Sequence, residues 1–410
     1  MSFEKFDTIL PSLAFDGDKA GGSLVIFKQG ELAYQTAFGQ ANAHAVWTPH
    51  SLSVNFSIGK GVMATLVAVL VSRGVLDYDT PISHCWADFR VNGKENITLM
   101  DVLTHTAGLY NIRSVMREND EITDWQGMLA KVAQMPISTP KDQETHAYAS
   151  AYSALVSGWV LGGVIERVTG KPLQSVLDDC LAEPLGVKGA LYFGLPSEQY
   201  DRLVLPEFLW HDQNQRRKPT LKPDSQKTLD FYKNLPIAHL WGETLNTQAI
   251  NRHYFDPSRM NLANYKDALL ADGKTPINYH SQAVVSVPVP AANGVSSAHA
   301  LATLYAMHAN GGVWRGETLI DPSTLAKLRT VRTQGFDAVM PADMRWRAGF
   351  HRLFSVQNAP NAYGHMGYNG SVAFCDPDRG LSVAFIHNFD TTMLNDVRQF
   401  VVSEMALLLS

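Results

Sequence analysis

Hydrophobic and polar residues alternate near both ends of the chain in the way that is typical of β-strands. Residues 23–28 and 31–38 are two such segments, and the Gln29-Gly30 pair between them is a turn signal, which predicts an antiparallel hairpin. Three further strands are expected near the C-terminus, at residues 347–354, 371–375 and 381–387.

Between these strands the pattern is helical. The segment from about Ser57 to Arg73 is apolar on nearly every face, which predicts a helix buried at the centre of a domain, and Gly74 supplies its C-terminal cap. Further helices are expected at 155–169, before Gly170, at 298–310, after the capping Ser297, and from about residue 392 to the end of the chain.

Strands at both ends with helices between them predict an α/β (α+β) fold with one antiparallel sheet. We expect residues 1–80 and 291–410 to form the sheet domain and residues 81–290 to form a mainly helical region. That region includes an insertion at 197–290, which we expect to act as a lid over a neighbouring site, with a charged tip at 216–218 that faces solvent or a second subunit. We expect this lid to cover the site with its aromatic residues Trp210, Trp241, Tyr254 and Phe255.

Composition excludes several classes of partner. The 410 residues carry a net charge of −5, so the chain has no basic footprint for nucleic acid. The longest aliphatic stretch, at 62–71, is too short to span a membrane, and the N-terminus lacks a signal-peptide pattern, so we expect a cytoplasmic protein. The three cysteines are scattered, and neither they nor the histidines have metal-ligand spacing. No metal and no cofactor are therefore expected, and nothing indicates the oligomeric state.

A Ser-x-x-Lys pattern stands at the start of the apolar helix, as Ser57 to Lys60. One helical turn separates the two residues, so the hydroxyl and the amine share a face, and an unprotonated lysine can activate a serine nucleophile. The pattern alone is common, and it recurs at residues 2–5 and 138–141. The first copy lies in a terminus, and prolines surround the second, so the helical context favours Ser57.

Three further motifs follow in order: residues 103–109 (LTHTAGL), residues 152–155 (YSAL) and residues 364–371 (GHMGYNGS). With Ser57 and Lys60 they resemble the serine β-lactamase-like superfamily, which includes class C β-lactamases, D-Ala-D-Ala carboxypeptidases and family VIII esterases. The resemblance covers nearly the whole chain, with 197–290 the least similar part. It implies a β-lactamase/DD-peptidase-like fold and catalysis through an acyl-enzyme.

The resemblance also implies roles for individual residues. Ser57 is similar to the family's nucleophile, Lys60 to its partner, and Tyr152 to the tyrosine that shuttles a proton; which of the two takes the proton stays open. The backbone N–H groups of Ser57 and Tyr368 would form the oxyanion hole. The substrate-binding positions implied by the second and third motifs are Ala154, His365, Met366 and Gly367.

Two departures from the family pattern bear on the substrate. β-Lactamases usually carry Lys-Thr-Gly where this chain has His365-Met366-Gly367, and Tyr-x-Asn where it has Tyr152 and Ala154. Both changes remove groups that hold a carboxylate-bearing acylamide, so the interpretation is a carboxylesterase that acts on short-chain esters. The alternatives are a D-amino-acid peptidase or amidase, a β-lactamase, or, from another class, a non-catalytic protein with this fold.

Rival assignments remain for single residues. Tyr148, one turn before Tyr152, is an alternative for the catalytic tyrosine, and His365 is either a substrate contact or a structural part of the site wall. The segment around His105 is expected to be an internal turn that buttresses the site. No Gly-x-Ser-x-Gly pattern occurs, which argues against an α/β-hydrolase nucleophile elbow.

Overall fold

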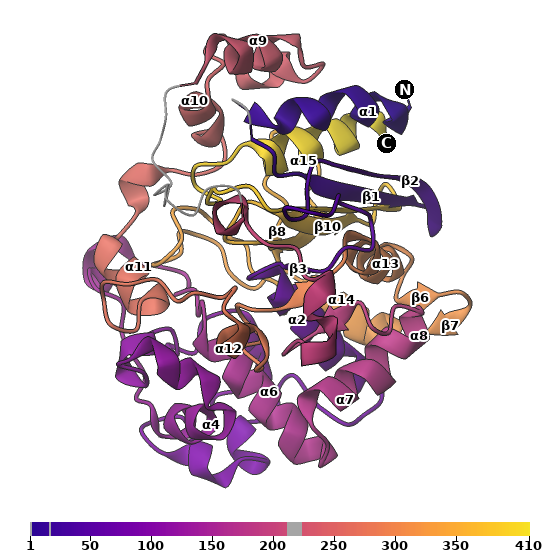
Figure 1. Cartoon of the computed structure of the whole chain (residues 1–410). Coiled ribbons are helices and arrows are strands. Elements are labelled where there is room, and N and C mark those ends of the chain that lie inside the picture. The colour runs from indigo at the N-terminus through magenta and orange to yellow at the C-terminus, as the bar shows by residue number, and fades with distance from the viewer. Residues whose placement is uncertain (1, 16–17, 211–223) are drawn as a thin grey trace.

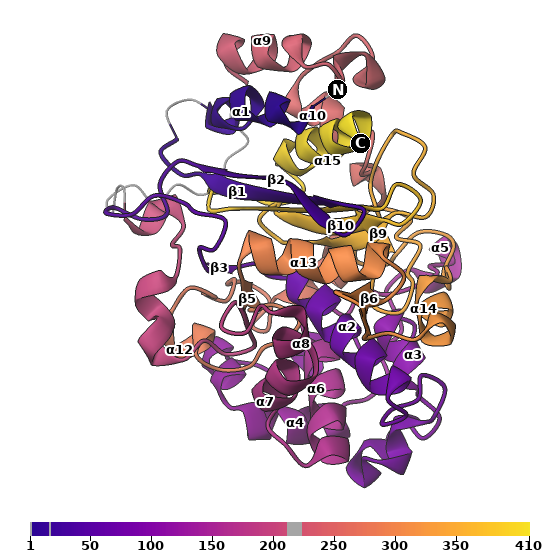
Figure 2. The same cartoon turned by 90° about the vertical axis from the view of Figure 1, so that its right-hand side faces the viewer.

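One antiparallel sheet lies between two layers of helices (Figures 1 and 2). This computed structural model describes residues 2–15, 18–210 and 224–410, and six strands pair in the order β2-β1-β11-β10-β9-β8. The sheet therefore joins the first and last parts of the chain, as the sequence predicts. Its strands are β1 (Gly22–Lys28), β2 (Glu31–Phe38), β8 (His351–Arg352), β9 (Tyr363–Met366), β10 (Val372–Asp376) and β11 (Leu381–His387).

The central strands of the sheet are buried on both faces, while the edge strand β2 is exposed or half-buried along its length. The N-terminal and C-terminal helices cover one face, and α13 packs on β1, β10 and β11 from the other (Figure 2). Strand β1 is accordingly apolar rather than alternating. The helices are α1 (Phe6–Ile9), α2 (Ile58–Ser72), α3 (Leu99–Leu103), α4 (Trp125–Gln134), α5 (Gln143–His146), α6 (Val156–Thr169), α7 (Leu173–Leu177), α8 (Glu183–Leu185), α9 (Gln226–Asn234), α10 (Thr247–Asn251), α11 (Leu262–Leu269), α12 (Gln282–Val285), α13 (Ala298–Ala309), α14 (Pro322–Arg329) and α15 (Arg398–Leu409).

Helix α2 connects the two halves of the molecule. It packs against α6, against α14 and against β9 of the sheet, and its side chains are buried from Ile58 to Leu70. A small sheet holds the segment that enters this helix: β3 (Ser53–Val54) pairs with β5 (Val295–Ser296), which pairs with β4 (Leu191–Tyr192). The prediction of a central helix is confirmed, and its start is anchored by strands from distant parts of the chain. No helix in the described ranges is long and apolar enough to cross a membrane.

Two predicted elements differ from the structure. Within residues 347–354 the extended sheet segment is only β8, because Arg347 N–H bonds to Phe350 in a turn that Gly349 enters with a φ of 84°. The last helix begins at Arg398 and not near residue 392. The residues just before it are not helical, because the Met393 N–H donates to the distant carbonyl of Tyr368 at 2.7 Å and not to a carbonyl one helical turn earlier.

The 197–290 insertion contributes to two places in the fold, and the prediction that its aromatic residues cover the site is wrong for Trp241, Tyr254 and Phe255. Trp241 donates to the hydroxyl of Tyr254, whose ring stacks on Phe400 of α15, and Phe255 packs against the same ring. These side chains therefore lie on the far face of the sheet, where α9 and α10 sit beside α15 (Figure 1). The charged tip at 216–218 lies outside the described residues, and Trp210 is bonded to the Leu205 carbonyl.

A buried carboxylate holds the insertion to α15. Glu404 has no exposed surface and accepts hydrogen bonds from Tyr254, Ser355, the Val356 N–H and Gln357, at 2.7 to 2.9 Å. Because four donors converge on it, the cost of taking its charge out of water is offset.

We therefore expect Glu404→Ala to lower the free energy of unfolding by about 3 kcal/mol, since it leaves several buried donors without an acceptor. Urea denaturation of the variant and the parent measures this difference. Glu404→Gln, which keeps the shape and one acceptor oxygen, should lose less. An unchanged denaturation midpoint for the alanine variant would contradict this role.

Candidate active site

Ser57 stands at the N-cap position of α2, and its side chain makes no capping hydrogen bond, which leaves the hydroxyl for other partners. The preceding residue, Phe56, has a φ of 48°, a left-handed conformation that is unfavourable for a non-glycine residue. The turn is held by the Ile58 N–H, which donates to the carbonyl of Asn55, and Asn55 is itself bonded to Ser296 of β5. This strained, well-anchored turn places the serine hydroxyl at the positive end of the helix dipole.

Lys60 follows one turn later, and its amine lies 3.2 Å from Ser57 Oγ. The same amine donates to the carbonyls of Ala154 and Ala291, both at 2.7 Å. Burial lowers the pKa of Lys60 well below its usual range. An unprotonated amine has two N–H donors and one lone pair, so the two carbonyls can take both donors and leave the lone pair for the Ser57 proton.

Glycines allow these carbonyls to come so close to the helix. A Cβ on Gly158 of α6 would lie 2.5 Å from the Ala291 nitrogen, and one on Gly59 would lie 2.9 Å from the carbonyl oxygen of Pro290. Larger residues at either position would push the loop at 289–294 outward. The pocket around the Lys60 amine thus depends on close backbone packing between two helices and this loop.

Tyr152 completes the cluster, because its hydroxyl donates to Ser57 Oγ at 2.7 Å. Burial raises the pKa of Tyr152, the hydrogen bond with Ser57 opposes that rise, and the charge of Asp337 adds to it. The phenol therefore remains protonated at neutral pH. The Lys60 amine lies 4.7 Å from the centre of the same ring.

Two aromatic residues hold the Tyr152 ring. Trp346 stacks on it with ring centres 5.6 Å apart and an interplanar angle of 8°, and His105 meets it edge-on at 5.0 Å. His105 has a φ of 58°, accepts the Ser153 N–H on Nδ1, and receives the Ala151 N–H on its carbonyl. The segment around His105 is the internal turn that the sequence predicts.

The third motif reaches the site from β9. A Cβ on Gly367 would lie 2.9 Å from the Asn55 carbonyl oxygen, so only a glycine lets this strand approach the turn before Ser57 so closely. His365 is 2% exposed, and its Nδ1 lies 2.9 Å from the carbonyl of Met366. Its Nε2 is buried and has no partner in the described part of the chain. Burial lowers the pKa of His365, which keeps the ring neutral.

Two backbone donors flank the serine. The N–H groups of Ser57 and Tyr368 have no acceptor among the described residues. Their backbone segments are adjacent, because a Cβ on Gly367 would lie 2.9 Å from the Asn55 carbonyl oxygen, and the ring centres of Tyr368 and Phe56 are 5.9 Å apart. Free N–H groups beside a nucleophile can stabilise a negatively charged oxygen. The geometry is compatible with the oxyanion hole that the sequence predicts.

The serine opens on a cavity of about 990 Å³. Ser57, Tyr152, Ala154, His365, Met366 and Tyr368 lie on its wall. The rest of the wall is largely apolar and comes from 204–209, 265–280 and 389–393, so the 197–290 insertion does shape this cavity, although with other side chains than its four predicted aromatics. No lysine or arginine is among the described residues that line it, and Asp390 is the carboxylate on the wall.

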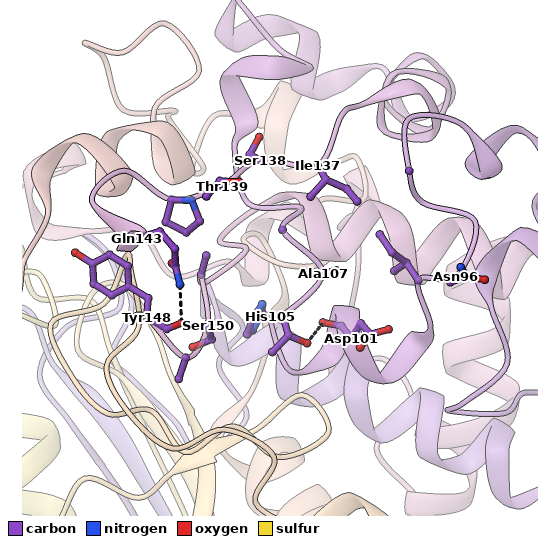
Figure 3. Close-up of a pocket in the computed structure, with 17 residues that line it drawn as sticks. Asn96, Asp101, His105, Ala107, Ile137, Ser138, Thr139, Gln143, Tyr148 and Ser150 are labelled. Atoms are coloured by element: carbon purple, nitrogen blue, oxygen red, sulfur yellow. Dashed lines mark hydrogen bonds between the residues drawn. The ribbon is translucent and has the colours of Figure 1, made fainter. Parts of the chain in front are cut away.

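A second, open hollow of about 470 Å³ lies behind His105 (Figure 3). Tyr148 lines this hollow and stacks on His146, and no contact joins it to Ser57 in the described chain. Ser138 lies there too, while the amine of Lys141 pairs with Asp267 at 2.8 Å. The structure therefore brings Tyr152 to Ser57 and Lys60, and it leaves the rival tyrosine and the rival Ser-x-x-Lys copy outside the site.

Several site residues have no signal in the sequence. Ala291 acts through its carbonyl, which any residue could supply, and Trp346, His351 and Asp337 belong to no motif that the sequence analysis recognises. His351 accepts the Met366 N–H on Nε2 at 3.0 Å and so holds the end of β9. These contacts arise from residues that are distant in the chain and adjacent only in the fold.

Comparison with known proteins agrees with this geometry. The family model described as "Beta-lactamase" matches residues 6–402, so the chain belongs to the Beta-lactamase family. The "Esterase/beta-lactamase LipL" of Mycobacterium tuberculosis is 27% identical over 391 residues, which is 93% of this chain and 79% of that protein. "Esterase EstB" of Burkholderia gladioli is 28% identical over 221 residues, or 51% of this chain and 54% of that protein.

Solved structures give the same result. A penicillin-binding protein homologue from Caulobacter crescentus superposes with a TM-score of 0.74 at 28% identity, covering 100% of this chain and 99% of that one. A family VIII carboxylesterase superposes with a TM-score of 0.73 at 26% identity, with the same coverage of 100% and 99%. The protein is a serine hydrolase with the β-lactamase/DD-peptidase-like fold.

Proposed function

We propose that the protein is a carboxylesterase that hydrolyses short-chain, uncharged esters through an acyl-enzyme on Ser57. The observation that carries this proposal is the Lys60 amine, whose pKa burial lowers and which lies 3.2 Å from Ser57 Oγ, while Ser57 itself lies on the wall of a largely apolar cavity that has no cationic side chain among its described lining. The esterase names of the relatives support the same reading.

In the proposed reaction Lys60 takes the proton of Ser57 as Oγ attacks the ester carbonyl. Its lowered pKa makes the amine available for this step, whereas Tyr152, with its raised pKa, keeps its proton. The negative charge that forms on the carbonyl oxygen is stabilised by the N–H groups of Ser57 and Tyr368.

Tyr152 then serves as the acid. Its hydroxyl lies 2.7 Å from Ser57 Oγ, close to where the leaving alkoxide departs, and it gives that alkoxide a proton. The ammonium of Lys60 returns a proton to Tyr152, which restores both groups. A water molecule releases the acyl group by the reverse sequence, so the products are a carboxylic acid and an alcohol.

The cavity supports a preference for uncharged substrates. A carboxylate on the substrate would find no lysine or arginine on the described wall to pair with, and burial keeps His351 and His365 neutral by lowering their pKa. Ala154 offers no amide to a substrate acylamide. The groups needed to hold a β-lactam or a peptide terminus are thus missing at Ala154 and His365, while the ester-cleaving groups are complete.

Proton transfer by Lys60 should give a characteristic pH profile. Because its pKa lies below the ordinary 10.5 and that of Tyr152 is raised, kcat/KM should rise as Lys60 loses its proton and then remain level into weakly alkaline pH. Initial rates on a nitrophenyl ester across pH measure this profile. A rise in kcat/KM centred near the ordinary lysine pKa would contradict the prediction.

Lys60→Arg, which stays charged, and Tyr152→Phe should each reduce kcat by about 10²-fold or more.

Ser57→Ala should abolish hydrolysis, because Ser57 is the serine, among the described residues, whose hydroxyl lies beside the Lys60 amine. A fluorophosphonate probe followed by peptide mass mapping should place one adduct on Ser57. Ser138→Ala is the matched control, since Ser138 shares the sequence pattern and lies outside the site. An adduct on Ser138, or no adduct on the parent, would refute the assignment.

Nitrophenyl butyrate should be hydrolysed at least about 10²-fold faster than nitrocefin in kcat/KM, because the site has no partner for the lactam carboxylate. The double variant Ala154→Asn/His365→Lys restores an amide and a cation, and it should raise lactam hydrolysis relative to ester hydrolysis. Equal turnover of both substrates by the parent enzyme would overturn the esterase assignment.

A further inference from the structure

A buried carboxylate, Asp337, lies behind Tyr152. It is 1% exposed, and its hydrogen-bond partners among the described residues are neutral donors. Its Oδ2 accepts from Ser150 Oγ at 2.6 Å and from the Trp346 indole at 3.4 Å. Its Oδ1 accepts the backbone N–H groups of Tyr152 at 3.2 Å, Val339 at 2.8 Å and Met340 at 2.9 Å.

These contacts join the segments that position the tyrosine. Residues 149–151 run parallel to residues 336–338, with the Ala149 N–H bonded to Phe336 and the Ala338 N–H bonded to Ser150. Asp337 lies at the centre of this pairing and clamps both the backbone of Tyr152 and the indole that stacks on its ring. Ser150 forms part of the wall of the hollow behind His105 (Figure 3).

We propose that Asp337 is a positioning residue for the reaction, which holds Tyr152 in place and keeps its hydroxyl protonated so that it can donate to the leaving group. The proposal rests on the esterase function proposed above. A buried carboxylate is costly to maintain, and neutral donors offset that cost without cancelling its charge. Burial is the main cause that raises the pKa of the Tyr152 hydroxyl, and the Asp337 carboxylate beside it adds to that rise, because a negative neighbour disfavours the phenolate.

Other titratable groups also face Tyr152, and they do not supply such a charge. Burial lowers the pKa of Lys60, His105 and His365, so all three are neutral when the enzyme is active. Asp337 is the carboxylate among the groups that act on the tyrosine. The groups in question are Lys60, His105, Asp337 and His365, with the phenols of Tyr265 and Tyr279 farther along the cavity wall.

The test is Asp337→Asn, which keeps the shape and removes the charge. We expect kcat per fluorophosphonate-titrated site to fall by about 10-fold to 100-fold with KM nearly unchanged, because the change affects proton donation and not substrate binding. Above the level part of the profile, the fall of kcat with rising pH (the alkaline limb) should begin at a lower pH than in the parent, since the phenol loses its proton more readily without the neighbouring negative charge. A side chain with a merely structural role would lower stability without moving that limb.

A double-variant cycle shows whether Asp337 acts through the tyrosine. In the Tyr152→Phe background, Asp337→Asn should cost little further activity, because the hydroxyl on which it acts is already gone. Glu404→Gln is the matched control: it alters an equally buried, multiply bonded carboxylate away from the cavity, and it should leave kcat and the pH profile unchanged. Equal losses from Asp337→Asn in both backgrounds, or an unmoved alkaline limb, would overturn the proposal.

If Asp337→Asn does not fold, Trp346→Phe carries the same test. It keeps an aromatic ring against Tyr152 and removes the indole N–H that Asp337 holds. We expect a severalfold fall in kcat that disappears in the Tyr152→Phe background, and unchanged kcat would overturn the proposal. A parent enzyme that neither hydrolyses esters nor labels on Ser57 would instead refute the proposed function, which keeps the two failures distinct.

Discussion

Burial of the Lys60 amine is the constraint on which the site depends. An ammonium in this environment would lose most of its hydration, so the neutral form is favoured, and two carbonyls at 2.7 Å accept its hydrogens. Those carbonyls belong to Ala154, before α6, and to Ala291, in a loop that only glycines at 59 and 158 admit. The central helix, its neighbour α6 and this loop must therefore pack closely for the amine to have its lone pair free.

The surrounding structure also fixes the positions of Ser57 and Tyr152. Strained residues cluster here, with Phe56 before the serine and His105 behind the tyrosine both in the left-handed conformation. The Asn55 N–H next to Phe56 donates to the carbonyl of Gly294, and the carbonyl of His105 accepts the Ala151 N–H, so distant segments of the fold stabilise the strain. The result is a site whose polar groups are preorganised, while the cavity in front of them is shaped by largely apolar side chains.

The insertion at 197–290 shows how one segment can serve two purposes. Its aromatic residues Trp241, Tyr254 and Phe255 fill the space against α15, and Glu404 satisfies the buried polar groups among them. The later part, from α11 to residue 280, returns to the cavity and lines it. Aromatic content alone could not separate these roles, because a large ring stabilises a core and a binding pocket by the same burial of apolar surface.

The sequence by itself determined the elements and the local chemistry. Periodicity identified the hairpin, the central helix and the sheet built from both termini, because these patterns reflect burial that repeats along the chain. The Ser57–Lys60 spacing also placed hydroxyl and amine on one helical face, as one turn of a helix requires. Only the tertiary structure decided which tyrosine meets the serine, which carbonyls hold the lysine, and where Asp337 and Trp346 lie. Those contacts join residues far apart in the chain, and no sequence pattern predicts which partner a backbone carbonyl or a buried carboxylate will have.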